Sequence, residues 1–153
     1  MAIYFYLQTE KPYGVFSNFS PHGFTLDGRY FPTSEHYFQA QKFAHSPENF
    51  EAVMNASRPM RCAEIGRERH RPLRADWDAV KDDVMRRAVR AKFEAHRELC
   101  ALLLATGDEA IIEKTSGDYY WGCGTDDTGK NRLGGILAEL RASLRADGTA
   151  TDE

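Results

Sequence analysis

The stretch Asp76 to Ala95 reads DWDAVKDDVMRRAVRAKFEA. Its apolar residues recur at intervals of three and four positions, as a helix with one apolar face requires. They are Trp77, Val80, Val84, Ala88, Ala91 and Ala95. We therefore predict that the longest helix of the chain begins near Asp76, and that the protein is mainly helical.

The same period extends toward the C-terminus. Leu99, Leu102 and Leu103 predict an apolar helix that ends at Gly107. The segment 111–113 is short and rich in isoleucine, which indicates a strand or an extended piece. A last amphipathic helix is predicted from five apolar positions: Leu133, Ile136, Leu137, Leu140 and Leu144.

Toward the N-terminus the pattern changes to short elements. Residues 3–7 predict a strand, and residues 23–31 predict a hairpin because Asp27-Gly28 suits a turn with positive φ. Three short helices follow, each opened by a proline and a serine or threonine. They are predicted from Pro32 to about Phe43, from Ser46-Pro47 onward, and from Ser57 and Pro59 to about Glu68. The fold class is thus mainly α with a small antiparallel β element.

The chain has 153 residues, a length typical of one domain, with 42% hydrophobic and 28% charged residues. We predict a single domain over residues 1–146 and a frayed acidic tail over 147–153. A net charge of -3 gives no global field for nucleic acid, and no apolar run approaches a membrane span. The start of the chain has no basic leader and no cleavage pattern.

Three cysteines stand far apart, in odd number and without metal-site spacing. This pattern favours a reducing compartment, so we expect a cytoplasmic protein without disulfides. The histidines form no pair of the kind that binds zinc. We expect no protein-bound metal and no cofactor.

The predicted helix after Pro32 gathers four polar groups within about two turns. Glu35, Gln39 and Lys42 share one face, and His36 lies beside them. An acid, an imidazole, an amide and an amine suit a catalytic site. The alternative is a solvated face on which Glu35 complements the helix dipole.

A second polar group lies in the glycine-rich run Ser116-Gly117-Asp118-Tyr119-Tyr120-Trp121-Gly122-Cys123-Gly124. The run has neither helical nor strand periodicity, and its glycines allow tight folding, so we predict a binding loop. Asp118 suits ribose hydroxyls or a cationic transition state, and Trp121 suits stacking on a base. Asn131 suits either an N-cap or a ligand contact. Cys123 has no evident partner base and is expected to be a structural or bystander thiol.

Two further stretches leave alternatives open. In Phe16-Ser17-Asn18-Phe19-Ser20, the Asn18 amide and the Phe19 ring suit either a loop-holding role or a planar ligand. A group of basic residues precedes the long helix: Arg58, Arg61, Arg67, Arg69, His70, Arg71 and Arg74. Acids are interleaved with them, so surface ion pairs are expected, and one or two arginines suit a phosphate pocket.

These motifs occur together and in one order, and the ordered set resembles the YbiA-like N-glycosidase family of the NADAR superfamily. The resemblance spans about Tyr13 to Arg145. It rests on the following residues: Phe16 to Phe19, Thr33 to Lys42, Gly66-Arg67, Trp77 with Lys81 and Met85, Lys92-Phe93, Thr106-Gly107, Asp118 with Trp121-Gly122, and Gly129 to Gly134. It implies a compact, single-domain, orthogonal helical fold.

The resemblance also implies a hydrolase that cleaves N-glycosidic bonds. Family members act on early riboflavin-pathway intermediates, in which an aminouracil is attached to ribose 5-phosphate, and others remove ADP-ribose from guanine bases in DNA. By motif, Glu35, Lys42 and Asp118 are the catalytic candidates. The substrate-binding candidates are Asn18, Phe19, Arg67, Trp121, Gly122 and Asn131.

Two routes of bond cleavage are compatible with these residues. In one, Glu35 is the general acid or base of an oxocarbenium-like transition state that Asp118 stabilises. In the other, the sugar ring opens and Lys42 forms a Schiff base. We expect a ribosylated, phosphorylated small molecule as substrate. ADP-ribosylated DNA and a non-catalytic ADP-ribose-binding role are the alternatives. The oligomeric state is left open.

Overall fold

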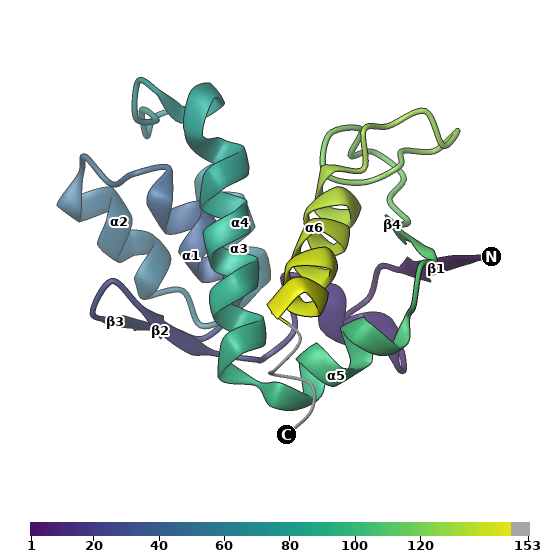
Figure 1. The fold of residues 1–153 in the computed structure, drawn as a ribbon. Coiled ribbons are helices and arrows are strands. Elements are labelled where there is room, and N and C mark those ends of the chain that lie inside the picture. The colour runs from purple at the N-terminus through teal and green to yellow at the C-terminus, as the bar shows by residue number, and fades with distance from the viewer. Residues whose placement is uncertain (148–153) are drawn as a thin grey trace. The chain divides into compact units, whose positions relative to one another are not determined.

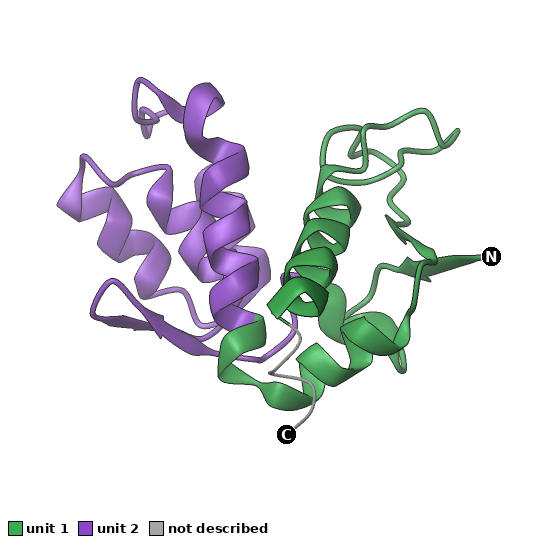
Figure 2. Ribbon diagram, viewed as in Figure 1, with its two compact units in different colours: residues 1–17, 93–153 green, residues 18–92 purple. Residues whose placement is uncertain are grey.

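The computed structural model describes residues 1–147 (Figure 1). The chain divides into two compact units (Figure 2). Unit 2 comprises residues 18–92, and unit 1 comprises residues 1–17 with residues 93 onward. The single domain expected over residues 1–146 stays a prediction. Of the tail expected over 147–153, Asp147 ends the last helix and the rest lies outside the described residues.

Unit 2 begins with the predicted hairpin. Strands β2 (Phe24–Leu26) and β3 (Arg29–Phe31) pair antiparallel, and the two residues between them have positive φ, 55° at Asp27 and 78° at Gly28. A two-residue turn of this kind matches the twist of the strands it joins. The antiparallel β element and its turn are therefore confirmed.

Three short helices follow in unit 2. In α1 (Ser34–Gln41) the Thr33 side chain accepts a hydrogen bond from the His36 N–H, and in α2 (Pro47–Met54) Ser46 does the same for Asn49. The Ser46 cap was predicted from the sequence, and Thr33 is one of two neighbouring residues, Thr33 and Ser34, that suited the start of α1. Helix α3 (Pro59–Gly66) differs, because its N-cap is Arg58, which makes no capping bond with its side chain. The start predicted at Ser57 is thus early.

Helix α1 packs against α2 and α3 and lies at the centre of unit 2 (Figure 1). The apolar cluster between these helices consists of Ala40, Phe43, Val53, Cys62 and Ile65. The predicted long helix is α4 (Trp77–Ala95), whose last three residues belong to unit 1. Its buried face includes Met85 and Val89 beside the predicted Val84 and Ala88.

Unit 1 contains the second pair of strands. Strand β1 (Ala2–Phe5) lies parallel to β4 (Ala110–Glu113), with Ala2 opposite Ala110. The sequence pattern predicted only an antiparallel element, because a parallel pair between segments so far apart leaves no local turn signal. A 3-10 helix, η1 (Tyr13–Phe16), follows β1.

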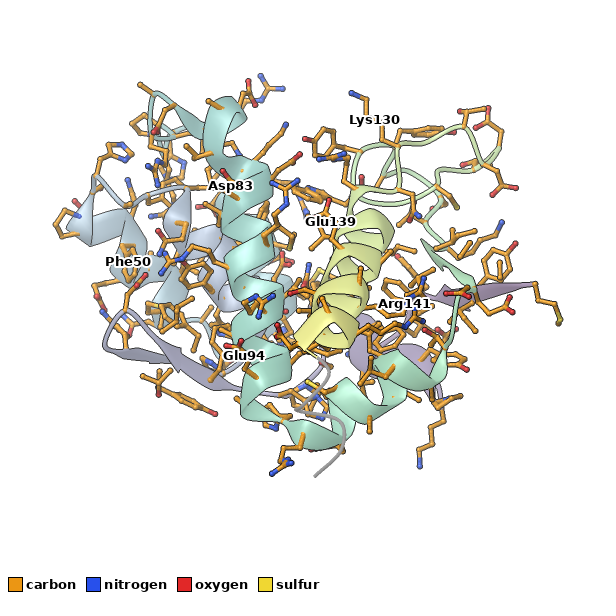
Figure 3. The ribbon with its side chains drawn as sticks, in the orientation of Figure 1. Phe50, Asp83, Glu94, Lys130, Glu139 and Arg141 are labelled. Carbon is orange, nitrogen blue, oxygen red and sulfur yellow. The ribbon has the colours of Figure 1, made fainter. Side chains whose placement is uncertain are left out.

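Two helices complete unit 1. Helix α5 spans Arg97–Ala105, and α6 spans Arg132–Asp147 with all five predicted apolar positions buried. Arg141 projects from α6 and is also buried (Figure 3). Its Nη1 donates to Thr106 Oγ1 at 2.8 Å and to the Glu109 carbonyl at 2.9 Å. The mainly helical fold class is confirmed.

Over residues 1–147, no helix is both long enough and apolar enough to cross a membrane. The three cysteines are free thiols.

Candidate active site

Helix α1 supplies the first candidate group, in unit 2. Glu35 lies in its first turn, where a carboxylate complements the helix dipole. The Glu35 N–H donates to the Asn18 carbonyl at 3.1 Å, which fixes the segment before the hairpin against the start of the helix. The helix thereby positions Glu35 at its N-terminal end and Lys42 at its C-cap.

Glu35 is held by a residue one turn later. Gln39 Nε2 donates to Glu35 Oε2 at 2.7 Å. Only 7% of Glu35 and 6% of Gln39 are exposed. A solvated helix face, the alternative left open by the sequence, is therefore wrong for these two residues. A buried carboxylate needs such hydrogen bonds, because burial removes its contacts with water.

Lys42 lies at the C-cap of α1, and its amine is close enough to Glu35 for the two charges to interact. Its Nζ donates to the Gly66 carbonyl at 3.4 Å. It lies 5.7 Å from the centre of the Phe38 ring and 5.9 Å from that of Trp77. The two rings pack edge to face, with centres 5.1 Å apart. The Lys42 amine therefore lies beside a packed pair of aromatic rings.

Burial lowers the pKa of Lys42. The Glu35 carboxylate opposes this shift, whereas the positive charges of Arg67 and Lys81 add to it. A lysine of lowered pKa presents more of its neutral amine near neutral pH, and the neutral amine is the nucleophile. The surroundings of Lys42 thus suit covalent attack on a carbonyl or imine carbon.

Asn18 is fixed by protein groups. Its Oδ1 accepts from Ser34 Oγ at 2.8 Å, and its Nδ2 contacts Met85 Sδ at 3.4 Å. The loop-holding role that the sequence allowed is therefore present. Phe19 is half-buried in the same segment.

His36 lies on a different side of α1. Its Nδ1 is 2.9 Å from Thr33 Oγ1 and its Nε2 is 2.9 Å from the Ala56 carbonyl. A carbonyl only accepts, so we assign the proton to Nε2. Burial lowers the pKa of this imidazole, which is only 1% exposed. His36 therefore holds α1 to its surroundings rather than joining Glu35 and Lys42.

The basic residues of unit 2 divide into paired and unpaired ones. Arg61 and Arg71 contact Glu68, and Arg74 contacts Asp76, as the interleaved acids predicted. Within residues 1–147, the guanidinium groups of Arg58, Arg67 and Arg69 make no ion pair. Arg67 is exposed at the C-cap of α3, and its charge acts on Lys42.

The second candidate group lies in the glycine-rich loop of unit 1. Asp118 Oδ1 accepts from the backbone N–H groups of Tyr120 and Trp121, at 2.9 and 2.8 Å. This is an Asx-type turn, in which a carboxylate shapes the loop that follows it. Trp121 is half-buried, and its ring packs edge to face on Tyr120 with centres 4.8 Å apart.

The two arms of this loop are joined by backbone hydrogen bonds. Lys130 donates to the Tyr119 carbonyl at 2.8 Å, and Leu133 donates to that of Trp121 at 3.0 Å. The ammonium of Lys130 lies 5.5 Å from the centre of the Tyr120 ring (Figure 3). A side chain at Gly122 would overlap the Thr115 side chain, so only glycine fits this close approach. Cys123 is buried, with Sγ 3.3 Å from the Gly124 carbonyl.

Asn131 fastens the loop to strand β4. Its Oδ1 accepts from the Glu113 N–H at 3.0 Å, and its Nδ2 donates to the Ile111 carbonyl at 2.8 Å. The residue has a positive φ of 51°, a conformation that asparagine tolerates better than most residues. Asn131 thus has a structural task that neither sequence alternative included.

The structure therefore forms two groups of predicted site residues. Unit 2 brings Asn18, Glu35, Lys42 and Arg67 to the region of α1, and unit 1 places Asp118, Trp121, Gly122 and Asn131 in one loop. Their union in one site stays a prediction. Sequence analysis did not place Phe38 and Gly66 at Lys42, because spacing within one helix does not show which other segment packs there. In the described part of the chain, no cluster of histidine, cysteine, aspartate and glutamate has the arrangement of a metal site.

Residues 4–145 match the family model of the NADAR domain. The chain belongs to the NADAR family. It is 52% identical to the N-glycosidase YbiA of Escherichia coli K12 over 139 residues, which cover 91% of this chain and 86% of that protein. It is 45% identical to the N-glycosidase Npun_R5314 of Nostoc punctiforme, over 95% of this chain and 94% of that one.

A solved structure agrees with these NADAR relatives. The NMR structure of E. coli YbiA matches with a TM-score of 0.89 and 49% identity, over 97% of this chain and 88% of that chain. The resemblance to YbiA-like N-glycosidases is confirmed. This NADAR chain is accordingly an enzyme, a hydrolase of N-glycosyl compounds.

Proposed function

We propose that this NADAR enzyme hydrolyses the bond between ribose 5-phosphate and the amino group of early riboflavin-pathway aminouracil intermediates. The observation that carries the proposal is the buried Glu35 carboxylate together with a Lys42 amine whose pKa burial lowers. Two relatives are named for the same pathway. They are the riboflavin biosynthesis proteins PYRR of Zea mays and VVA0006 of Vibrio vulnificus, at 38% and 39% identity. The matches cover 91% and 94% of this chain, but only 25% and 38% of those longer proteins.

The first route uses Lys42 as a nucleophile. The sugar ring opens as its C1–O bond breaks, the ring oxygen takes a proton, and C1 becomes an imine to the base nitrogen. The neutral Lys42 amine adds to C1, the aminouracil leaves as a free amine, and water then releases ribose 5-phosphate from the lysine imine. Glu35 moves the protons between nitrogen and oxygen.

The second route needs no covalent intermediate. The C1–N bond breaks first, and positive charge develops on the sugar. The Glu35 carboxylate stabilises that charge and accepts a proton from the attacking water. In this route Lys42 is in its ammonium form and donates a proton to the departing nitrogen as the C1–N bond breaks. The two routes differ in whether the protein ever carries the sugar.

For the phosphate we propose Arg67. A guanidinium offers several N–H donors to phosphate oxygens. Arg67 is exposed, makes no ion pair within the described residues, and is close enough to act on the charge of Lys42. From the resemblance we also propose that Asp118 and Trp121 contact the substrate. Asp118 would bind the ribose hydroxyls, and the Trp121 ring would stack on the base.

The substrate test compares two purified reactants. The protein is incubated without added metal with the ribosylaminouracil phosphate, and separately with DNA that carries ADP-ribose on guanine. Release of ribose 5-phosphate from the first reactant alone supports the proposal. Release of ADP-ribose from DNA alone supports the second candidate. Arg58 and Arg69, which make no ion pair with residues 1–147, favour that candidate because a polyanion needs free cations. Inactivity on both reactants would overturn the proposed substrate.

The route is tested by borohydride reduction during turnover. If Lys42 forms the imine, the protein gains the mass of the sugar phosphate, and the adduct maps to Lys42. Lys42→Arg keeps the charge but cannot form an imine, so it gives no adduct. Lys11→Met is the control, since it removes an exposed lysine that does not act on Lys42 and should leave the adduct. An active wild type without any adduct supports the second route.

A further inference from the structure

The two polar atoms of the Gln39 amide differ in their hydrogen bonding to the described residues. Its Nε2 donates to Glu35 Oε2 at 2.7 Å. Its Oε1 is buried and accepts no hydrogen bond from any residue between 1 and 147. Buried amide oxygens nearly always have a partner, so one without a partner needs an explanation.

The Gln39 oxygen lies against the backbone of Gly66, which has no side chain to displace it. A Cβ atom at Gly66 would overlap Gln39 Oε1 and would lie 3.1 Å from Lys42 Nζ. The φ of Gly66 lies outside the left-handed region, so the backbone there would accept other residues. Because Gly66 has no side chain, the Gln39 oxygen and the Lys42 amine both fit against its backbone, and a Cβ there would displace them.

The free oxygen of Gln39 thus lies near the same backbone position as the Lys42 amine. Lys42 Nζ already donates to the Gly66 carbonyl at 3.4 Å. If Lys42 attacks C1 of a ribosyl group, the groups nearest to Gln39 are those on C1 and C2 of the sugar. Both carry hydrogen-bond donors, the N–H or O–H on C1 and the O–H on C2.

We propose that Gln39 is a substrate-binding residue, whose Oε1 accepts a hydrogen bond from the donor on C1 or C2 of the ribosyl group. Its Nε2 simultaneously holds the Glu35 carboxylate. One amide thereby fixes the general acid/base relative to the reacting end of the sugar. This inference rests on the proposed N-ribosyl substrate. It adds that the enzyme prefers substrates with a free N–H or O–H group on C1 or C2 of the sugar.

The main test is Gln39→Met, which keeps the length of the side chain and removes both hydrogen bonds. We expect kcat/KM for the ribosylaminouracil phosphate to fall by about ten- to hundredfold, the usual effect of losing a buried hydrogen bond to a ligand. Gln41→Met on the same helix is the matched control and should keep the wild-type value. Circular dichroism checks that each variant is folded.

Binding of ribose 5-phosphate provides a readout apart from turnover. We expect Gln39→Met to bind it more weakly than wild type, whereas a purely structural role would leave this affinity unchanged. 2-Deoxyribose 5-phosphate identifies the donor. If the donor is on C2, wild type prefers the ribose form and the variant loses that preference. If it is on C1, both proteins bind the two sugars alike, and the variant binds both weakly.

Gly66→Ala approaches the same oxygen from the other side and covers the case in which Gln39→Met does not fold. It should cause a similar loss, whereas Gly135→Ala, where an added Cβ meets open space, should not. Wild-type affinity and wild-type kcat/KM in Gln39→Met would overturn the inference while leaving the proposed function intact. An inactive wild type would instead overturn the proposed function, and the sugar-binding comparison would still decide the role of Gln39.

Discussion

Glu35 and Lys42 stand at the two ends of α1, and their charges interact. Burial lowers the pKa of Lys42, and the Glu35 carboxylate partly opposes this effect. The two residues therefore form an electrostatic pair as well as two chemical groups. A change in the carboxylate must alter the protonation of the amine.

Glu35→Gln should reduce turnover by about two to four orders of magnitude, the usual loss when a general acid/base is removed. It should also lower the pKa of Lys42 further, because the variant removes the charge that raises it. If the imine forms, adduct formation should then persist to lower pH than in wild type. The measurements are kcat and the pH profile of borohydride trapping.

Glu48→Gln, which changes an exposed acid in the first turn of α2, is the control. Wild-type kcat in Glu35→Gln would remove Glu35 from the mechanism.

Asp118 has a structural role in its loop that can be separated from its charge. Asp118→Asn keeps an oxygen for the N–H groups of Tyr120 and Trp121, whereas Asp118→Ala removes it. We expect both variants to lose turnover if the charge acts on the sugar, and only Asp118→Ala to disturb the loop. Tryptophan fluorescence and kcat measure the two effects. An Asp118→Asn variant with full activity would limit Asp118 to shaping the loop.

Asn131 should contribute to the stability of unit 1. Asn131→Gly removes both side-chain bonds to β4 but tolerates the positive φ of 51°. We expect a loss of about 1–3 kcal/mol in the free energy of unfolding, because two backbone groups lose their partners. Urea denaturation measures it. Asp127→Gly, in the same loop with a φ of 65° and an exposed side chain, should have a much smaller effect. Equal stability of the two variants would contradict the role of the amide.

Lys92 should make stability depend on pH. Burial lowers its pKa to about 7, whereas an unfolded lysine titrates near about 10.4. Between these values the unfolded chain binds a proton that the folded chain does not, so stability rises with pH in this window. Its contribution to the slope is at most about 1.4 kcal/mol per pH unit. Lys92→Met should flatten the slope in urea denaturation between pH 7 and pH 9.5, and exposed Lys11→Met should not. An unchanged slope in Lys92→Met would mean that Lys92 remains charged in the fold.

Local sequence signals predicted most of the elements. The period of three and four residues located α4 and α6, and Asp27-Gly28 located the hairpin turn, because both signals lie within a few neighbouring residues. The parallel pairing of β1 with β4 had no such signal, since its strands are about a hundred residues apart. The start of α3 was predicted too early. Ser57 is a residue type that commonly caps helices, but the N-cap position is occupied by the next residue, Arg58.

The sequence by itself determined the helical fold class, the NADAR family, and the spacing that puts Glu35, Gln39 and Lys42 on one face of α1. These follow from backbone geometry, which has the same period in every helix. Only the tertiary structure decided that Glu35 and Gln39 are buried, that two aromatic rings and the Gly66 carbonyl lie near the Lys42 amine, and that Asn131 is bonded to β4. Burial and charge depend on which distant segments pack together. Those contacts shift the pKa values of the polar residues on α1, which spacing along the helix does not reveal.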